Sequence, residues 1–152
     1  MKPSDLTATE KLALLRLGLP RGWVFLAALL GAAAVAVGAY AAHGLERSLA
    51  ERGFDVAAVA EKVDQTRTAV QYHSLHSLAL LAISASCYIR RSRLAGAAAW
   101  MWLVGILLFS GGLYSLAIFD RIGHWAIVPA GGASFILGWL LLAVSAVTAR
   151  DL

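Results

Sequence analysis

Long stretches of apolar residues alternate with short charged segments along this chain. The first uncharged stretch, 23–42, has 20 residues. At about 1.5 Å per residue, a helix of that length crosses a hydrocarbon core of about 30 Å. Three further apolar stretches cover about 69–89, 94–119 and 125–149. The pattern predicts an all-α integral membrane protein whose domain, 23–149, is a bundle of four transmembrane helices.

The residues before the first stretch follow a different pattern. Thr7 and Glu10 fit a capping box, in which each side chain satisfies a free backbone N–H at a helix start. Apolar residues follow at helical spacing, at Ala8, Leu12, Leu15 and Leu19. Gly18 and Pro20 then end the pattern. We therefore expect residues 1–22 to be a short amphipathic leader helix on the cytoplasmic membrane surface.

The one sizeable polar connection is the segment 43–68. It carries most of the charges between the first and second stretches, and its second half keeps helical spacing of valine and alanine. We expect an amphipathic helix that starts near Asp55 and runs into the second span. Two shorter polar turns, at 90–93 and 120–124, join the remaining spans.

The composition agrees with a membrane protein. Sixty per cent of the residues are hydrophobic and 14% are charged, whereas soluble domains are about 25% charged. With four spans, both termini share one side with eight cations: Lys2, Lys11, Arg16, Arg21, Arg90, Arg91, Arg93 and Arg150. The other side has five: Arg47, Arg52, Lys62, Arg67 and Arg121. The positive-inside rule therefore predicts an inner-membrane protein with cytoplasmic termini.

Several function classes find little support in the sequence. The net charge of +4 comes from cations that flank the spans, and no basic stripe with interleaved aromatics indicates nucleic-acid binding. The single cysteine, Cys87, excludes an intrachain disulfide. No span has an acidic or basic residue in its interior, which disfavours a coupled transporter. No acid is placed to orient Ser74 or Ser77 beside the histidines, so we expect no catalytic residues.

The histidines are the most distinctive polar feature. The topology places all four at the outer side: His43, His73, His76 and His124. Further polar groups lie at a similar depth: Tyr40, Gln71, Tyr72 and Tyr114. His73 and His76 are three residues apart and so share a helix face with Ser77, Ser84 and Cys87, opposite Leu75 and Leu78. We expect this polar face to point into the bundle.

Three interpretations of these histidines remain open. They can cap helix ends by hydrogen bonding to backbone carbonyls, as polar groups near a bilayer require partners. They can form a site for a metal ion or haem, with His43, His73 and His76 as ligands, since imidazole is a common ligand. They can also titrate protons or contact a quinone near neutral pH.

Small residues follow the predicted spans at positions suited to close helix packing. The predicted packing glycines are Gly31, Gly38, Gly111, Gly112, Gly131, Gly132 and Gly138. Lipid is as apolar as leucine, so close backbone approach stabilises a membrane bundle more than additional leucine contacts. An alternative for Gly131 and Gly132, which follow Pro129, is that they shape a ligand niche.

Four ordered motifs make the chain resemble the YgdD-like family (domain of unknown function 423), which includes a human mitochondrial relative. They are GAYAAHG at 38–44, AVQYHSLHSLALL at 69–81, GILLFSG at 105–111, and PAGG at 129–132 followed by LGWL at 137–140. The resemblance covers roughly 23–147 and implies a small four-span membrane protein without a known activity. It favours His43, His73 and His76 over His124, which lies in none of the motifs.

Two main hypotheses of function follow. The first is a non-enzymatic accessory or assembly subunit that packs in the lipid bilayer against a larger membrane complex or a second copy of itself. The second is a redox or transfer protein that binds a metal or haem through the histidines. A small transporter or channel is a weaker third hypothesis.

Overall fold

The computed structural model describes residue 7 and residues 21–86, 92–120 and 126–148. Within these ranges the chain is helical and has no strand. The predicted leader lies outside them apart from Thr7, Arg21 and Gly22, so the leader helix remains a prediction. Cys87 and His124 also lie outside the described residues.

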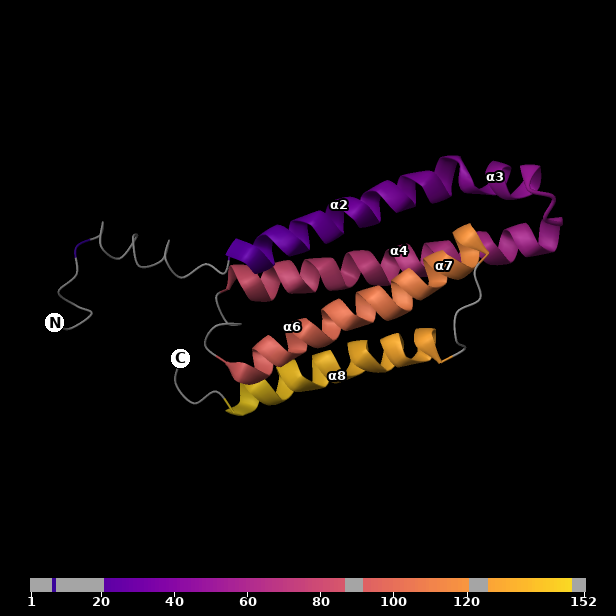
Figure 1. Ribbon diagram of the computed structural model, residues 1–152. Coiled ribbons are helices and arrows are strands. Elements are labelled where there is room, and N and C mark those ends of the chain that lie inside the picture. Colours follow the sequence, from indigo (N-terminus) through magenta and orange to yellow (C-terminus); the bar gives the residue numbers. More distant parts are fainter. Residues whose placement is uncertain (1–6, 8–20, 87–91, 121–125, 149–152) are drawn as a thin grey trace.

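The helices run back and forth between two ends of a bundle (Figure 1). In chain order they are α2 (Arg21–His43), α3 (Leu45–Glu51), α4 (Val56–Ala85), α6 (Arg93–Gly105), the π-helical turn η2 (Ile106–Ser110), α7 (Gly111–Phe119) and α8 (Ile127–Thr148). Together α6, η2 and α7 make one rod. The start of α2 and the end of α8 lie at the same end of the bundle (Figure 1).

Three of the described helices are long and apolar enough to cross a membrane: Arg21–His43, Arg93–Phe119 and Ile127–Thr148. They correspond to the first, third and fourth predicted spans. The first begins two residues earlier than predicted, because Arg21 and Gly22 belong to α2 and not to the leader. The predicted second span lies along α4, whose histidines, serines and glutamine make it less apolar than the other three.

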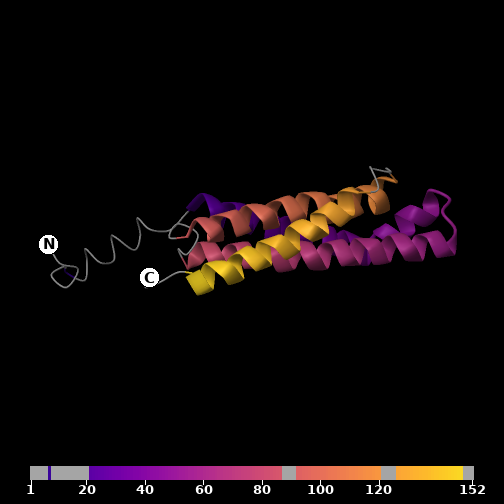
Figure 2. The ribbon, with the colours of Figure 1, turned by 90° about the horizontal axis from the view of Figure 1, so that it is seen from below.

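The structure confirms the predicted helix start at Asp55. Its carboxylate is the N-cap of α4 and accepts a hydrogen bond of 2.8 Å from the backbone N–H of Ala58. From there α4 continues without a break for 30 residues, or about 45 Å at the usual rise per residue. This helix is longer than a hydrocarbon core, and its first turns project with α3 beyond the ends of α7 and α8 (Figure 2).

The helix α3 was not predicted, because the segment after His43 looked like a polar loop. Its two leucines, Leu45 and Leu49, are one turn apart and completely buried. They pack against Val59, Val63 and Phe54 on the neighbouring part of the chain. The turn into α4 passes through Gly53, whose φ of 87° favours glycine.

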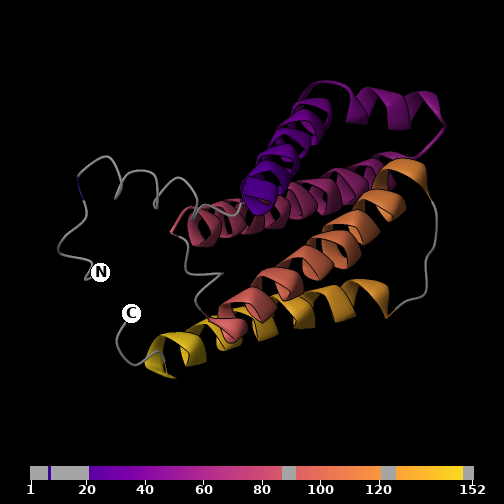
Figure 3. The same cartoon turned by 60° about the vertical axis from the view of Figure 1, so that its left-hand side comes forward.

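Two helix pairs pack more extensively than any other, α2 with α4 and α6 with α8 (Figure 3). The central helix α4 also contacts η2 and α7, whereas α2 packs mainly on α4. Three alanines spaced seven residues apart, Ala27, Ala34 and Ala41, form the buried side of α2. Near the start of α2, Trp23 meets Trp100 of α6 edge to face, with ring centroids 5.1 Å apart.

Two cations tie the end of α7 to α3 and α4. Arg52 donates a 2.7 Å hydrogen bond to the carbonyl of Ile118, and Lys62 donates one of 3.1 Å to Leu116. The last carbonyls of a helix lack partners within the helix and carry partial negative charge, so cations stabilise this end. Lys62 also pairs with Asp120 at 2.6 Å, and this contact lowers the pKa of the Asp120 carboxyl.

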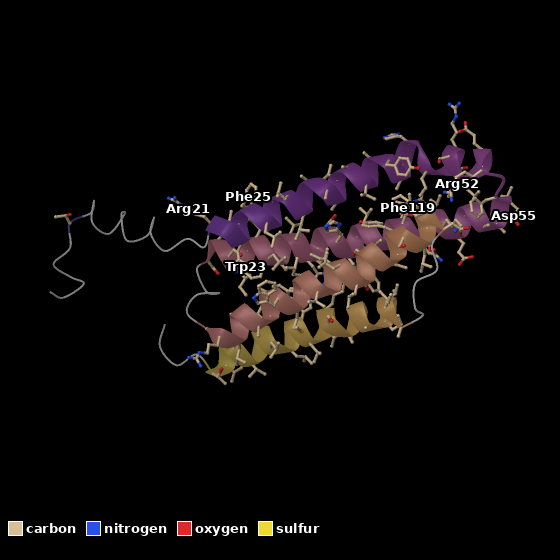
Figure 4. All side chains as sticks on the ribbon, viewed as in Figure 1. Arg21, Trp23, Phe25, Arg52, Asp55 and Phe119 are labelled. Carbon is tan, nitrogen blue, oxygen red and sulfur yellow. The ribbon has the colours of Figure 1, made fainter. Side chains whose placement is uncertain are left out.

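Charged and aromatic side chains mark the two ends of the bundle (Figure 4). Arg21 and Trp23 lie at the end where α2 begins, and Arg52 and Asp55 lie at the opposite end. Such residues prefer the interface between membrane and water.

Candidate functional site: a buried histidine and aromatic cluster

The inner face of α4 is polar, as its spacing predicts. His73, His76, Ser77 and Ser84 are all buried within the bundle, with at most 6% of each residue exposed. Leu75 and Leu78, on the opposite face, are 51% and 64% exposed. The polar side chains therefore lie between helices, and the leucines lie where lipid would surround the bundle.

Both ring nitrogens of His76 have partners. Nδ1 lies 2.8 Å from the backbone carbonyl of Tyr72, and Nε2 accepts a 3.2 Å hydrogen bond from the indole N–H of Trp139. A carbonyl can only accept and an indole N–H can only donate, so His76 is the neutral tautomer protonated at Nδ1. Its one lone pair is directed at Trp139, and none remains for another ligand.

The imidazole of His76 lies within a cluster of aromatic rings from α4, α8 and the rod formed by α6 and η2. This ring cluster consists of Tyr72 and His76 of α4, Trp102 of α6, Phe109 of η2, and Phe135 and Trp139 of α8. His76 stacks on Phe135 with centroids 3.6 Å apart. Trp102 lies 4.6 Å from Trp139, and Tyr72 lies 4.9 Å from Phe109. The rings fill the space between α4 and α8, whose backbones make few direct contacts.

Glycines provide the space that the rings occupy. A Cβ on Gly138 would lie 2.5 Å from the Trp102 ring, one on Gly105 would collide with the Phe135 ring, and one on Gly131 would collide with the Phe109 backbone. Gly112 is also tight, because its Cβ would be 2.9 Å from Val128. The α6–α8 interface is therefore built from rings set against bare backbone.

The other predicted packing glycines differ in their surroundings. A Cβ on Gly38 would be 3.3 Å from Val70, a moderately close approach of α2 to α4. Gly111 and Gly132 would make only ordinary contacts, and a Cβ on Gly31 would meet nothing within 4 Å. Gly31 therefore does not mark a close helix contact within this chain.

The π-helical turn η2 lies at the centre of the site. It interrupts the rod between Gly105 and Gly111 and contacts both α4 and α8. A π-turn changes the rotation of the residues that follow it, and such turns often occur at functional sites. Here Phe109 of this turn packs on both Tyr72 and Phe135. The hydroxyl of Ser110, at the end of the turn, is buried without a hydrogen-bond partner among the described residues.

His73 lies one turn before His76 and has a different environment. Its Nδ1 is 3.3 Å from the hydroxyl of Tyr114 on α7. Its Nε2 is buried and has no hydrogen-bond partner in the part of the chain that the structure describes. His73 therefore retains one ring nitrogen that could bind a ligand, and Tyr114 is the predicted polar residue nearest to it.

The remaining predicted residues do not join this site. His43 is the last residue of α2 and is exposed, and Tyr40 and Gln71 are exposed as well. Among the described residues, no three His, Cys, Asp or Glu side chains are grouped so that they could hold a metal ion. The structure thus brings together His73 with Tyr114, and Tyr72 with His76, but does not gather His43, His73 and His76 around one point.

The aromatic partners of His76 are the residues that the sequence interpretation missed. Phe135 and Trp139 are one turn apart on α8, and Trp102 and Phe109 are seven residues apart along the third apolar stretch. This spacing places each pair on one helix face, which could have indicated a ring surface. Chemically, the arrangement offers neutral rings and hydrogen bonds but no paired acid and base.

Known proteins resemble the chain over most of its length. The family described as "Protein of unknown function (DUF423)" matches residues 37–132. A UPF0382 membrane protein of Haemophilus influenzae is 37% identical over 131 residues, covering 86% of this chain and 97% of the relative. UPF0382 membrane protein YwdK of Bacillus subtilis is 34% identical over 130 residues, covering 82% and 95%. UPF0382 inner membrane protein YgdD of Escherichia coli K12 is 33% identical over 128 residues, covering 84% and 90%. No solved structure matches the chain.

Proposed function

We propose, from the premise that this chain belongs to the DUF423 family, that it is a non-enzymatic accessory or assembly subunit of a larger bacterial inner-membrane complex. An Escherichia coli relative is named an inner membrane protein, and the chain has three helices suited to cross a bilayer. We therefore expect the chain to bind such a partner within the membrane.

The direction of the helices supports four spans. If α2 crosses the bilayer, it carries the chain to the end of the bundle where α3 lies, whereas α6 begins at the opposite end (Figure 1). The chain must return between them, and α4 is the helix that does so. Its polar face is covered by neighbouring helices, as a span with histidines and serines requires.

The distribution of cations supports cytoplasmic termini. The end of the bundle that holds Arg21 and Arg93 belongs to the side with eight Lys and Arg residues, and the α3 end belongs to the side with five. The positive-inside rule assigns the richer side to the cytoplasm.

The observation that carries the non-enzymatic role is the complete engagement of His76. Its donor and its acceptor are both used within the bundle, and its ring is stacked on Phe135. A side chain held this way orients α4 against α8 and has no free group for chemistry. His76 thus supports a role in holding the fold.

The first helix offers a surface for a partner. Because α2 packs mainly on α4, much of its circumference is open, including Phe25, Leu29 and Val35, which are 66%, 52% and 72% exposed. The open backbone at Gly31 lies on the same helix. A partner helix could approach there more closely than lipid chains pack.

Mild-detergent purification from native membranes tests this function. We expect the chain to co-purify with a membrane complex at a fixed ratio, and we expect Gly31→Leu to reduce that ratio without unfolding the bundle. Val147→Leu, on an exposed position of α8, is the matched control. A chain that always purifies alone under conditions that keep other inner-membrane complexes intact would contradict the proposal.

A second function, metal or haem binding, is favoured by one observation. His73 keeps a buried Nε2 without a partner among the described residues, although no second ligand is grouped with it. Metal analysis and a visible spectrum of protein purified without chelator test this function. A stoichiometric metal or haem band that His73→Ala abolishes would support it, and a blank would contradict it. Transport or channel activity has less support, because the described span interiors have no Asp, Glu, Lys or Arg.

A further inference from the structure

A shallow groove lies between α2 and α4 at the level where α4 loses its charges. It has a volume of about 240 Å³ and is lined by Gly38, Ala41 and Ala42 of α2 and by Arg67, Val70 and Gln71 of α4. Arg67 is the last charged residue of α4, and none occurs from 68 to the end of that helix. The groove therefore begins at the expected membrane boundary and continues along apolar side chains into the bilayer.

The positive charge at the mouth of this groove has no partner among the described residues. Arg67 is exposed and forms no hydrogen bond or ion pair with another described residue, unlike Arg52 and Lys62, which cap the end of α7. A second hollow, of about 360 Å³, continues from Arg67 toward Phe54 and Glu46 beside α3. The carboxylate of Glu46 lines this second hollow, whereas no acidic residue lines the groove between α2 and α4.

We propose that this groove binds one anionic phospholipid from the leaflet at the α3 end of the bundle. The guanidinium of Arg67 would pair with the headgroup phosphate, and Gln71, one turn deeper, would donate its amide hydrogen to an ester carbonyl. One acyl chain would then lie along Gly38, Ala42 and Val70. The proposal does not depend on the accessory-subunit role.

The residues that line the groove match the parts of a phospholipid in sequence, with the charged group at the headgroup level and the small residues at the level of the acyl chain. A guanidinium forms two parallel hydrogen bonds to phosphate and is weakly hydrated, so it suits a headgroup at a membrane boundary. Gly38 and Ala42 are small residues in the lining, and a large side chain at the exposed position of Ala42 would close the groove. A single cation near the surface changes affinity for anionic lipid by about 1 kcal/mol, which corresponds to about fivefold.

Native mass spectrometry of the full chain in a mild detergent tests the proposal. The probes are phosphatidylglycerol and phosphatidylcholine with identical acyl chains, added at equal concentration. We expect one phosphatidylglycerol to be retained about fivefold better than phosphatidylcholine. Arg67→Gln should bring that ratio close to one, whereas the control Arg47→Gln, an equally charged exposed site on α3, should leave it unchanged.

A second variant tests the groove apart from its charge. Ala42 is exposed, so Ala42→Phe should fold and fill the groove, and it should reduce retention of both lipids at least severalfold. Circular dichroism and gel filtration verify that each variant keeps its helices and size. Equal loss in Arg67→Gln and Arg47→Gln, no loss in Arg67→Gln, or full retention in Ala42→Phe would each overturn the proposal.

Discussion

The two principal helix pairs of this bundle, α6–α8 and α2–α4, make similarly extensive contacts. They do so with different residues, since the first pair packs aromatic rings on glycines and the second packs alanines. In α6–α8, large rings sit directly on glycine backbone, as Trp102 does on Gly138 and Phe135 does on Gly105. In α2–α4, a row of alanines contacts α4, and the closest glycine, Gly38, approaches only to a Val70 methyl. In the first pair, large rings fit closely over glycines, whereas in the second pair small side chains of similar size face the neighbouring helix.

This difference predicts different tolerance to change. Where a ring fills the space above a glycine, an added methyl group has no place to go, because packed interiors rarely contain spare volume. Where alanines meet a neighbouring helix, small changes can be absorbed by slight shifts. We therefore expect α6–α8 to specify the fold and α2 to be the more adaptable helix.

The sharpest test of this comparison is a methyl group added on each side. Gly138→Ala should lower the free energy of unfolding by about 3 kcal/mol, because its Cβ would lie 2.5 Å from the Trp102 ring. Gly38→Ala should change that free energy by less than about 1 kcal/mol, since its Cβ would be 3.3 Å from a Val70 methyl group and alanine favours a helix. Unfolding in mixed detergent and dodecyl sulfate, followed by circular dichroism, measures both. Similar effects of the two substitutions would remove the distinction between the pairs.

The next largest effect concerns the histidines. His76→Ala should lower the free energy of unfolding by about 2 kcal/mol, because Trp139 loses its acceptor and Phe135 loses a stacked ring. His43→Ala, at an exposed position on α2, should have almost no effect. The same unfolding assay applies. A large effect at His43 would show that α2 makes a contact that stabilises the fold as much as the ring cluster does, and would contradict the distinction between the two helix pairs.

A smaller effect on stability is expected at the end of α7, where Lys62 of α4 contacts that helix. Lys62→Met keeps the apolar stem but removes the cation from Leu116 and Asp120, and should lower the free energy of unfolding by about 1 kcal/mol. The control is Arg47→Gln, which removes an exposed pair with Glu51 and should change stability little. Equal changes in the two variants would indicate that the contacts of Lys62 with α7 contribute nothing measurable.

The smallest effect is a dependence on pH at the same place. Lys62 lowers the pKa of Asp120 in the folded state, so the contribution of this carboxylate is fully present above its unfolded pKa of about 3.9. It is lost as pH falls through the lower folded pKa. Asn accepts the left-handed backbone found here, so Asp120→Asn is a suitable variant.

The stability difference between wild type and Asp120→Asn should be constant from pH 7 to about 5 and should shrink below about 4. Unfolding curves at several pH values measure it. In a Lys62→Met background the difference should vanish throughout. A difference that is the same at pH 7 and pH 3 would contradict this assignment.

Much of the architecture could be predicted from the sequence. Long uncharged stretches predicted the three apolar helices, Asp55 predicted the start of α4, and the spacing of His73 with Ser77 and Leu75 predicted the buried face of α4. These features depend only on local periodicity and on the capping chemistry of one residue. The helix α3 was missed because its only signal is the pair Leu45 and Leu49 within a charged segment.

The candidate site was predictable only in part, for reasons of rotation. Periodicity shows which residues share a helix face, but it does not show which neighbouring helix that face meets. His43 illustrates this limit, since the contact face of α2 is defined by Ala41 and the residue two positions later points elsewhere. The pairing of His76 with Trp139 also depends on η2, and no residue in 106–110 indicates a π-turn rather than an α-turn.

The contact between Trp102 and Trp139 has a practical consequence for spectroscopy. Their indole centroids are 4.6 Å apart, and the ring planes are inclined by 52°. Transitions of two chromophores this close couple to one another, so the pair should give a bisignate exciton signal in the ultraviolet circular dichroism spectrum. Separation of α6 from α8 would remove the contribution of this pair while the helices themselves persist, and the contribution of Trp23 with Trp100, whose centroids are 5.1 Å apart, would remain. The Trp102–Trp139 pair is therefore an intrinsic spectroscopic probe of the contact between α6 and α8, and no attached dye is needed.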